Sequence, residues 1–434
     1  MARGAIGAWR APGSRGGWLS AQVATRSPGV GRVLSAKAES IRGLFLLPVA
    51  ILVGVVVGLW RLIRRAKPLA KSARFAIEPD GPPMTDVAAY AARIESESMH
   101  ERPGYGTKDF LMVYAPDLIP SVLDIRPRFS NRFFSCPPPF RRVIIESLDG
   151  TPISAEVAAR EDVGRPGLVV VHGVFGSSGQ RIYSDQAVRA YADWGFNVAI
   201  IDLRGWSRSA TLSNIPMSGG WREAEDVLAA AKWLLENTAT STVGAIGFSL
   251  GGASVLLAAA HDRAPELLRS GVLSEAGYVD AREVVRIIDR NPGLMSREHL
   301  AYRLFTVSFS EKFRCEGRGR MSITDYFERV SAPYYGVSVD ELYDMDSVVN
   351  CVDRIRVPAL HIHAADDWVV HVRHAERLRA AAEEAENRLV GVCVKPRGAH
   401  CAFSRVAPAW RDRVAREYFA ATSGVRLLEP VPGN

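Results

Sequence analysis

Cysteine is scarce in this sequence, and no two cysteines have the C-x-x-C spacing of a metal or redox pair. The five are scattered: Cys136, Cys315, Cys351, Cys393 and Cys401. Because a disulfide framework needs an even set and a structural zinc site needs paired ligands, the sequence predicts neither, and it favours a reducing compartment. Cys401 is expected to be a small buried residue and not a redox centre.

Acidic residues are almost missing from the first 74 positions, which hold 13 Lys/Arg and a single acid, Glu39. The whole chain of 434 residues has a formal net charge of +7, so the remainder is slightly negative. Because the basic charge is confined to one terminal segment, the composition argues against a nucleic-acid partner. Residues 1–42 predict a disordered basic tail, with an organelle transit peptide as the alternative.

Charge is also absent from residues 43–60, which are mostly apolar. A membrane-crossing helix needs about 20 predominantly apolar residues, and Leu62 and Ile63 extend the run to residues 43–63. The sequence therefore predicts a single-pass membrane protein with the lipid bilayer as a partner. Since more basic residues follow the run than precede it, the rest of the chain is expected on the cytoplasmic side. A buried core helix is the alternative.

No internal repeat is visible, and residues 64–140 predict a proline-rich connector with one helix near residues 84–99. A domain over residues 141–424 follows, in which strands and helices alternate. Such alternation predicts an α/β fold: a mostly parallel eight-stranded sheet with helices on both faces. The expected strands are residues 143–147, 153–158, 168–171, 196–201, 243–246, 271–274, 359–363 and 389–394. The expected helices are residues 180–194, 222–235 and 405–420.

One segment, at about residues 279–350, breaks this alternation. It contains no clear strand, and its pattern predicts helices over residues 281–289, 296–309 and 323–330. It is rich in aromatic residues: Tyr302, Phe305, Phe309, Tyr326, Phe327, Tyr334 and Tyr335. An apolar helical cap over an active site would suit an apolar substrate. The alternative is an ordinary helical insertion whose aromatic side chains pack inward.

A candidate nucleophile lies in residues 247–251, which read Gly-Phe-Ser-Leu-Gly and match G-x-S-x-G. This pattern places a serine on a sharp turn between a strand and a helix. The turn is crowded, so glycines without a Cβ flank Ser249. The amides at the start of the following helix, Leu250 first among them, point at the same place and can stabilise negative charge.

Serine needs a base and a group that orients the base. In sheets of this kind the chain order is serine, acid, histidine. Asp366 and Asp367 follow the strand at residues 359–363, and His400 lies in the loop beyond the next strand. Both loops are expected at the carboxyl edge of the sheet, where active sites form.

A second donor for an oxyanion is expected in the loop after residues 168–171, which begins His172-Gly173-Val174. The amide of Val174 is the candidate donor beside that of Leu250. His172 itself is expected to stabilise the turn. Histidines also cluster at His361, His363, His371 and His374. Core packing or a solvated helix face is the expected role of that cluster, with a metal site as the alternative.

Five motifs stand in order: His-Gly-x-x-Gly, Asp-Leu-Arg-Gly at residues 202–205, Gly-x-Ser-x-Gly-Gly, the Asp-Asp loop and Gly-Ala-His-x-x-Phe. Over about residues 125–422 the sequence resembles the α/β-hydrolase superfamily, most closely its membrane-anchored abhydrolase-domain lipase and esterase branch. The resemblance assigns the nucleophile to Ser249, the base to His400 and the acid to Asp367 rather than Asp366. Two departures are Ala364, where a glycine is usual, and Trp206, where a histidine is common.

The resemblance implies a membrane-anchored serine hydrolase that cleaves carboxylic esters, and lipid acyl esters in particular. No cofactor and no metal is implied. Acyl transfer, thioester cleavage and peptide cleavage on the same fold are alternatives, as is a non-catalytic binding protein with a hydrolase-like fold. The partner is an acyl-ester small molecule or lipid, and the oligomeric state is left open.

Overall fold

The computed structural model describes residues 77–99, 136–161, 164–289 and 321–427. The predicted tail, the predicted crossing segment at residues 43–63, most of the connector and the predicted helix at residues 296–309 lie outside these residues.

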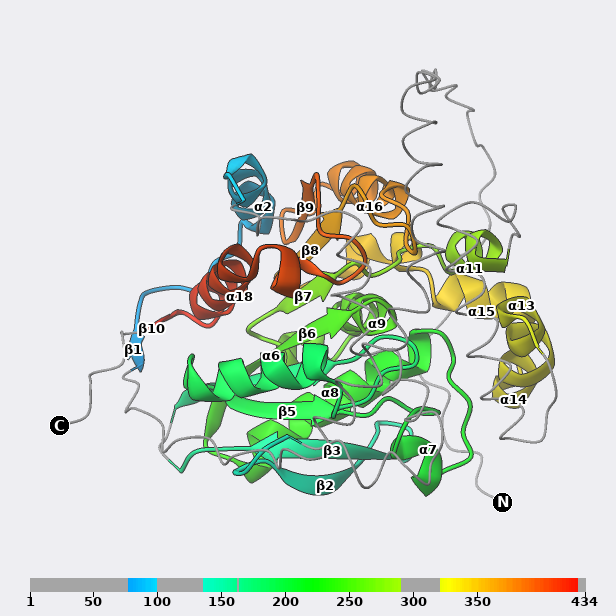
Figure 1. Cartoon of the computed structure of the whole chain (residues 1–434), viewed down its shortest axis with the longest axis horizontal. Coiled ribbons are helices and arrows are strands. Elements are labelled where there is room, and N and C mark those ends of the chain that lie inside the picture. Colours follow the sequence, from blue (N-terminus) through cyan, green and yellow to red (C-terminus); the bar gives the residue numbers. More distant parts are fainter. Residues whose placement is uncertain (1–76, 100–135, 162–163, 290–320, 428–434) are drawn as a thin grey trace, which may run out of the picture.

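A twisted sheet of eight strands forms the centre of the molecule (Figure 1), in the order β2-β3-β5-β4-β6-β7-β8-β9. The pairs β2–β3 and β3–β5 are antiparallel and all other neighbours are parallel. The strands are β2 Arg141–Glu146, β3 Pro152–Ala158, β4 Arg165–Val171, β5 Asn197–Ile201, β6 Thr240–Phe248, β7 Val272–Glu275, β8 Ala359–Ala364 and β9 Val390–Lys395. This confirms the predicted α/β-hydrolase fold and its mostly parallel sheet.

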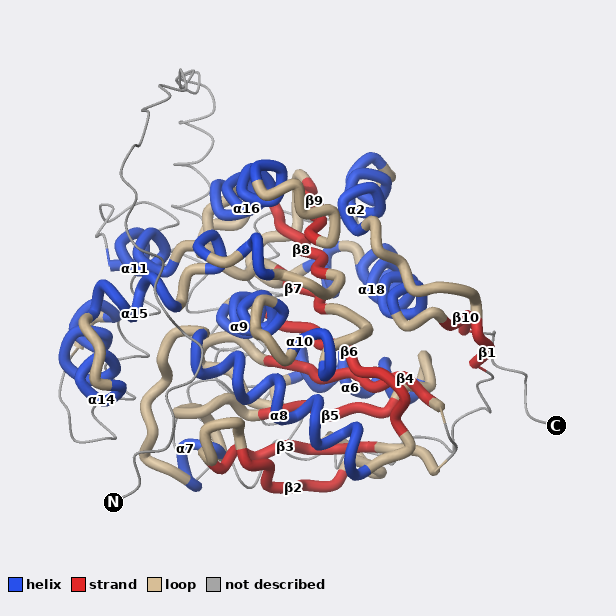
Figure 2. Tube along the Cα trace, turned by 180° about the vertical axis from the view of Figure 1, so that it is seen from behind, coloured by secondary structure: helices blue, strands red, loops and turns tan. Residues whose placement is uncertain are grey.

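Helices cover both faces of the sheet, because successive side chains of its inner strands point to opposite sides. Along β4, Leu168 and Val170 pack into the core under α2, α6 and α18, whereas Val169 and Val171 pack under α8, α9 and α16. Figures 1 and 2 show these two helical layers from opposite sides. Their bounds are α2 Val87–Ser96, α6 Arg181–Ala192, α8 Trp221–Asn237, α9 Leu250–Ala259, α16 Arg373–Glu384 and α18 Pro408–Thr422.

Shorter helices fill the connections between these layers: α7 Ser209–Leu212, α10 Ala264–Leu267 and α17 Phe403–Val406. The helix predicted over residues 405–420 is divided into α17 and α18, because Pro408 has no amide hydrogen to continue a helix and starts a new one. The helix predicted near residues 84–99 is α2, which begins after the cap residue Asp86. The Asp86 carboxylate accepts the Ala89 amide at 3.0 Å.

The prediction of a single-pass membrane protein is corrected. Its crossing segment, residues 43–63, is not among the described residues, and no described helix is both long enough and apolar enough to cross a bilayer. A crossing helix needs about 20 apolar residues. By comparison, α8 has 17 residues and α18 has 15, and both carry charged side chains along their length. The structure therefore does not support a single-pass membrane localisation.

The described part of the predicted cap is helical. It consists of α11 Ala281–Asp289, α13 Ile323–Tyr326, a π-helical turn at Phe327–Ser331, α14 Ala332–Tyr335 and α15 Val339–Met345. Tyr326 and Phe327 are buried and pack edge to face with ring centroids 5.8 Å apart. For these two residues the inward-packing alternative is correct. Tyr334 stays exposed.

A separate two-stranded antiparallel sheet pairs β1, Ile77–Pro79, with β10, Val425–Leu427. It lies at one edge of the molecule, beside α18 (Figures 1 and 2). Strands of three residues carry too little alternation to be predicted from sequence.

Candidate active site

Ser249 forms the turn between β6 and α9 and has an unusual backbone conformation. Its φ is 53° and its ψ is −117°, which is strained for a residue with a side chain. The turn is fixed from both sides: the Ser249 amide donates to the Glu275 carbonyl at 3.0 Å, and the Ser249 carbonyl accepts the Ala253 amide at 3.0 Å. A small part of Ser249, 8%, remains exposed. The serine thus sits at the N-terminus of a ten-residue helix, as the motif predicts.

The two glycines of the motif are required by close backbone contacts. A Cβ on Gly247 would overlap the Gly251 carbonyl. A Cβ on Gly251 would lie 2.5 Å from the His172 oxygen and 2.6 Å from the Val171 oxygen. Since real Cβ atoms do not approach backbone oxygens so closely, both positions exclude side chains. The contacts also bring the loop after β4 against the Ser249 turn.

His400 is hydrogen-bonded to Asp367. Its Nδ1 lies 2.9 Å from Asp367 Oδ2, with the Asp367 side chain fully buried and 12% of the His400 side chain exposed. The other oxygen, Oδ1, accepts the amides of Val369 at 2.9 Å and Val370 at 3.0 Å. Burial would raise the pKa of Asp367, but His400 first, and then His363 and the Val369 amide, lower it overall. Burial would likewise lower the pKa of His400, and the Asp367 carboxylate raises it well above its ordinary value.

Asp366, the other candidate acid, has a different set of contacts. Its Oδ1 accepts the amides of Gly398 at 2.9 Å and Ala399 at 2.8 Å, just before His400. Ala399 has a positive φ of 45°, so this loop is tightly bent. Asp366 therefore anchors the backbone that carries His400, a role that the sequence did not reveal.

The His400 loop and the Ser249 turn meet at the Glu275 carbonyl. Cys401 places its Sγ 3.6 Å from this oxygen, which also accepts the Ser249 amide. Cys401 is 5% exposed, in agreement with its predicted role as a small buried residue. Residues far apart in sequence, 249 and 401, are thus held by one acceptor.

The loop after β4 lies against the serine on its other side. A Cβ on Gly173 would be 3.1 Å from the Ser249 Cβ, so Val174 immediately follows a residue in contact with the serine. His172 Nε2 accepts the Leu203 amide at 3.0 Å, and its Nδ1 therefore donates to the Gly173 carbonyl at 2.7 Å. Burial lowers the pKa of His172. These contacts confirm that His172 stabilises the turn.

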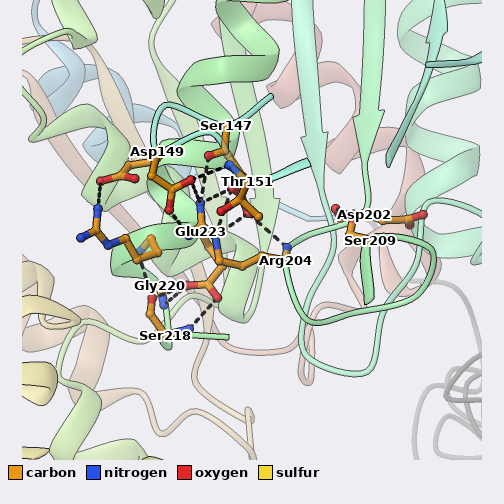
Figure 3. A network of polar contacts seen from close by, with 12 residues as sticks. Ser147, Asp149, Thr151, Asp202, Arg204, Ser209, Ser218, Gly220 and Glu223 are labelled. Atoms are coloured by element: carbon orange, nitrogen blue, oxygen red, sulfur yellow. Dashed lines mark hydrogen bonds and ion pairs between the residues drawn. The ribbon is translucent and has the colours of Figure 1, made fainter. Parts of the chain in front are cut away.

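Arg204, from the Asp-Leu-Arg-Gly motif, connects the loop after β5 with α8 and with the turn between β2 and β3 (Figure 3). Its fully buried guanidinium donates to Asp226 on α8 at 2.6 Å, to Asp149 at 2.7 Å and to Ser147 at 2.9 Å, the last two in the β2–β3 turn. The motif therefore has a structural role. Two residues further on, Trp206 packs edge to face on Phe175 with centroids 5.3 Å apart, so the tryptophan shapes the loop that follows Val174.

His361, His363 and His374 are fully buried, as the core-packing alternative expects. Their hydrogen bonds are considered below. Within the residues that the structure describes, no group of three or more His, Cys, Asp or Glu side chains could hold a metal ion. In the sequence, His361 and His363 alternate along one predicted strand, which indicates that their side chains share a face. The alternation does not reveal what their rings contact.

Comparison with known proteins gives a family match and more distant relatives. The family described as serine aminopeptidase, S33 (Hydrolase_4) matches residues 165–404, more than half of the chain. An abhydrolase domain-containing protein of Dictyostelium discoideum is 22% identical over 64% of this chain and 73% of its own length.

Two solved structures resemble the chain at low sequence identity. The Pyrococcus furiosus esterase Pf2001 has a TM-score of 0.47 at 17% identity, covering 67% of this chain and 93% of the esterase. The Pyrococcus horikoshii acylaminoacyl peptidase has a TM-score of 0.43 at 18% identity, covering 64% of this chain and 41% of the peptidase.

Proposed function

The chain belongs to the serine aminopeptidase S33 family of the α/β-hydrolase superfamily, and on that basis we propose that it cleaves carboxylic esters with Ser249, His400 and Asp367. The observation that supports this proposal most is the 2.9 Å hydrogen bond between His400 and Asp367. It lies in a loop that shares the Glu275 carbonyl with the strained Ser249 turn. A base with an orienting acid beside a serine at a helix N-terminus is the arrangement that acyl transfer to serine requires.

In the proposed reaction, the Ser249 Oγ attacks the ester carbonyl carbon while His400 Nε2 takes the hydroxyl proton. Asp367 holds the ring so that Nδ1 keeps its hydrogen and Nε2 faces the serine. The carbonyl oxygen becomes an oxyanion, and the amides of Val174 and Leu250 are the proposed donors that stabilise it. His400 then gives its proton to the departing alkoxide. Water then attacks the acyl carbonyl carbon while His400 takes its proton. The bond to Ser249 Oγ breaks, His400 returns the proton to that oxygen, and the acid leaves.

A fluorophosphonate probe and p-nitrophenyl butyrate test the proposal together. The full chain is expected to be labelled and to hydrolyse the ester, whereas Ser249→Ala loses labelling and at least about 10³-fold of kcat. Ser241→Ala is the matched control, because Ser241 is an exposed serine on β6. Labelling of Ser249→Ala equal to that of the wild type would contradict the proposal. A panel of p-nitrophenyl esters from acetate to palmitate then measures the preference for long, lipid-like acyl chains.

Aminopeptidase activity is the second candidate, because the matching family carries that description. Ester and amide cleavage share the acyl-enzyme and differ in the leaving group, since an amine leaves less readily than an alkoxide and depends more strongly on the proton from His400. Hydrolysis of alanine p-nitroanilide is therefore measured beside that of p-nitrophenyl butyrate. A kcat/KM that is higher for the anilide would favour the peptidase over the esterase.

A further inference from the structure

Two buried histidines on β8 form a hydrogen-bonded chain that the proposed reaction does not use. His361 and His363 are two residues apart, so their side chains lie on the same face of the strand. His361 Nδ1 lies 3.0 Å from Ser274 Oγ on β7, and His361 Nε2 lies 3.2 Å from His363 Nδ1. The His363 Nε2 lies 2.9 Å from the Val370 carbonyl. The chain thus crosses from β7 to the loop that follows β8.

The direction of every hydrogen bond in this chain follows from its last acceptor. The Val370 carbonyl can only accept, so His363 Nε2 carries a hydrogen. Burial lowers the pKa of both His363 and His361, so the rings are neutral and each has one acceptor nitrogen. His363 Nδ1 therefore accepts from His361 Nε2, and His361 Nδ1 accepts from the Ser274 hydroxyl.

The chain ends on Val370, the residue whose amide binds the proposed catalytic carboxylate. The Val370 carbonyl accepts from His363, while the Val370 amide donates to Asp367 Oδ1 at 3.0 Å. His363 Nε2 lies 3.8 Å from Asp367 Oδ2, which is beyond hydrogen-bonding range. That oxygen is therefore left to His400, at 2.9 Å.

We propose that His363, supported by His361, is a positioning residue: it holds Val370 through its carbonyl, and Val370 in turn holds the Asp367 carboxylate through its amide. The inference rests on the proposed function, since it assigns Asp367 as the acid. A neutral imidazole suits this place because it both accepts and donates, at opposite ends of a rigid ring. A charged one would compete with His400 for Asp367. The titratable groups around His363 are His361, His371, His374, Asp367 and His400.

Two variants of His363 test the proposal because they keep different parts of the ring. His363→Gln retains a donor near the position of Nε2, and His363→Asn does not reach that far. With p-nitrophenyl butyrate, His363→Asn is expected to lose on the order of 10-fold to 100-fold in kcat, with KM nearly unchanged. The midpoint of the acid limb of its kcat/KM profile moves to lower pH, because a less firmly held Asp367 raises the pKa of His400 less. His363→Gln recovers most of the rate and the midpoint.

A purely structural role would lower the active fraction without moving the midpoint. A wild-type midpoint in His363→Asn, or a loss in His363→Gln equal to that in His363→Asn, therefore overturns the proposal. Inactivity of the wild type and of Ser249→Ala alike would instead reject the proposed function.

A measurement on the wild-type protein keeps the inference testable if His363→Asn does not fold. In the full chain labelled with ¹⁵N-histidine, nuclear magnetic resonance reports the tautomer of each ring. His361 and His363 are expected as Nε2–H tautomers that stay neutral at pH values below the ordinary histidine pKa of about 6.5. Ser274→Ala, which removes the donor to His361 Nδ1, identifies the His361 signals. An Nδ1–H tautomer at either ring overturns the proposed chain.

Discussion

Asp366 and Asp367 are adjacent in the sequence, yet their carboxylates hold the His400 loop from two sides. Asp367 binds the imidazole through Oδ2, and Asp366 binds the amides of Gly398 and Ala399 through Oδ1. One carboxylate therefore fixes the ring and the other fixes the backbone that carries it. This division separates the expected effects of two similar substitutions.

Asp367→Asn is expected to lower kcat by about 10³–10⁴-fold, because an amide no longer holds the His400 ring in its required tautomer. Asp366→Asn keeps an oxygen that accepts the two amides, so its kcat is expected to stay within about tenfold of the wild type. Steady-state kinetics with p-nitrophenyl butyrate compare the two, with the exposed Asp353→Asn as control. A larger loss of kcat in Asp366→Asn than in Asp367→Asn would show that Asp366, and not Asp367, is the acid.

The pH dependence of kcat/KM follows from the His400–Asp367 pair. Only neutral His400 can take the Ser249 proton, and Asp367 raises the pKa of His400 despite its burial. Activity is therefore expected to rise with pH through a midpoint above the ordinary histidine pKa of about 6.5. In Asp367→Asn the raising charge is gone, so the midpoint of the residual activity is expected at lower pH. A midpoint in Asp367→Asn at or above that of the wild type would exclude this origin of the shift.

Gly251→Ala is expected to destabilise the protein by about 3 kcal/mol, because its Cβ would meet two backbone oxygens that cannot move independently. It is also expected to displace Ser249 and abolish activity. Gly336→Ala is the control: Gly336 has a φ of +68° and nothing within 4 Å of its Cβ position. That change should cost only the left-handed backbone penalty of about 1–2 kcal/mol and leave activity intact. Urea unfolding and ester hydrolysis test both, and equal stabilities would refute the close-contact explanation.

Arg204→Ala is expected to destabilise the protein by about 3–5 kcal/mol, because it leaves the buried Asp226 without its charged partner. Arg426→Ala, which breaks an exposed pair with Glu78, should have no measurable effect on urea unfolding at pH 7.

The Arg204 effect should also depend on pH. Burial would raise the pKa of Asp149, but Arg204 lowers it overall. A lowered carboxyl pKa adds stability above the unfolded value of about 3.9, and this stability is lost as the pH falls through the folded value. The difference between wild type and Arg204→Ala is thus expected to shrink between pH 7 and pH 3, and a constant difference would contradict the Arg204–Asp149 link.

The sequence predicted the elements whose pattern is local. Residues 168–171 of β4 are a continuous apolar run, and the Gly-x-Ser-x-Gly turn is specified by its own neighbours. The contacts of Asp366 and His363 could not be predicted, because they depend on how the loops after β8 and β9 fold. Tyr326 and Phe327 illustrate the same limit, since aromatic content alone does not tell a substrate-facing side chain from a packed one. The single-pass prediction rested on hydropathy alone and is not supported by the described helices.

The small sheet of β1 and β10 has a mechanical consequence. Ile77 pairs with Leu427, and Pro79 pairs with Val425, so the chain enters and leaves at the open end of this ribbon. A force applied just before Ile77 and just after Leu427 would therefore break the residue pairs of this sheet one after another, from Ile77–Leu427 inward. In optical tweezers this should appear as an early, low-force extension, with the eight-stranded sheet bearing load only after the ribbon has parted.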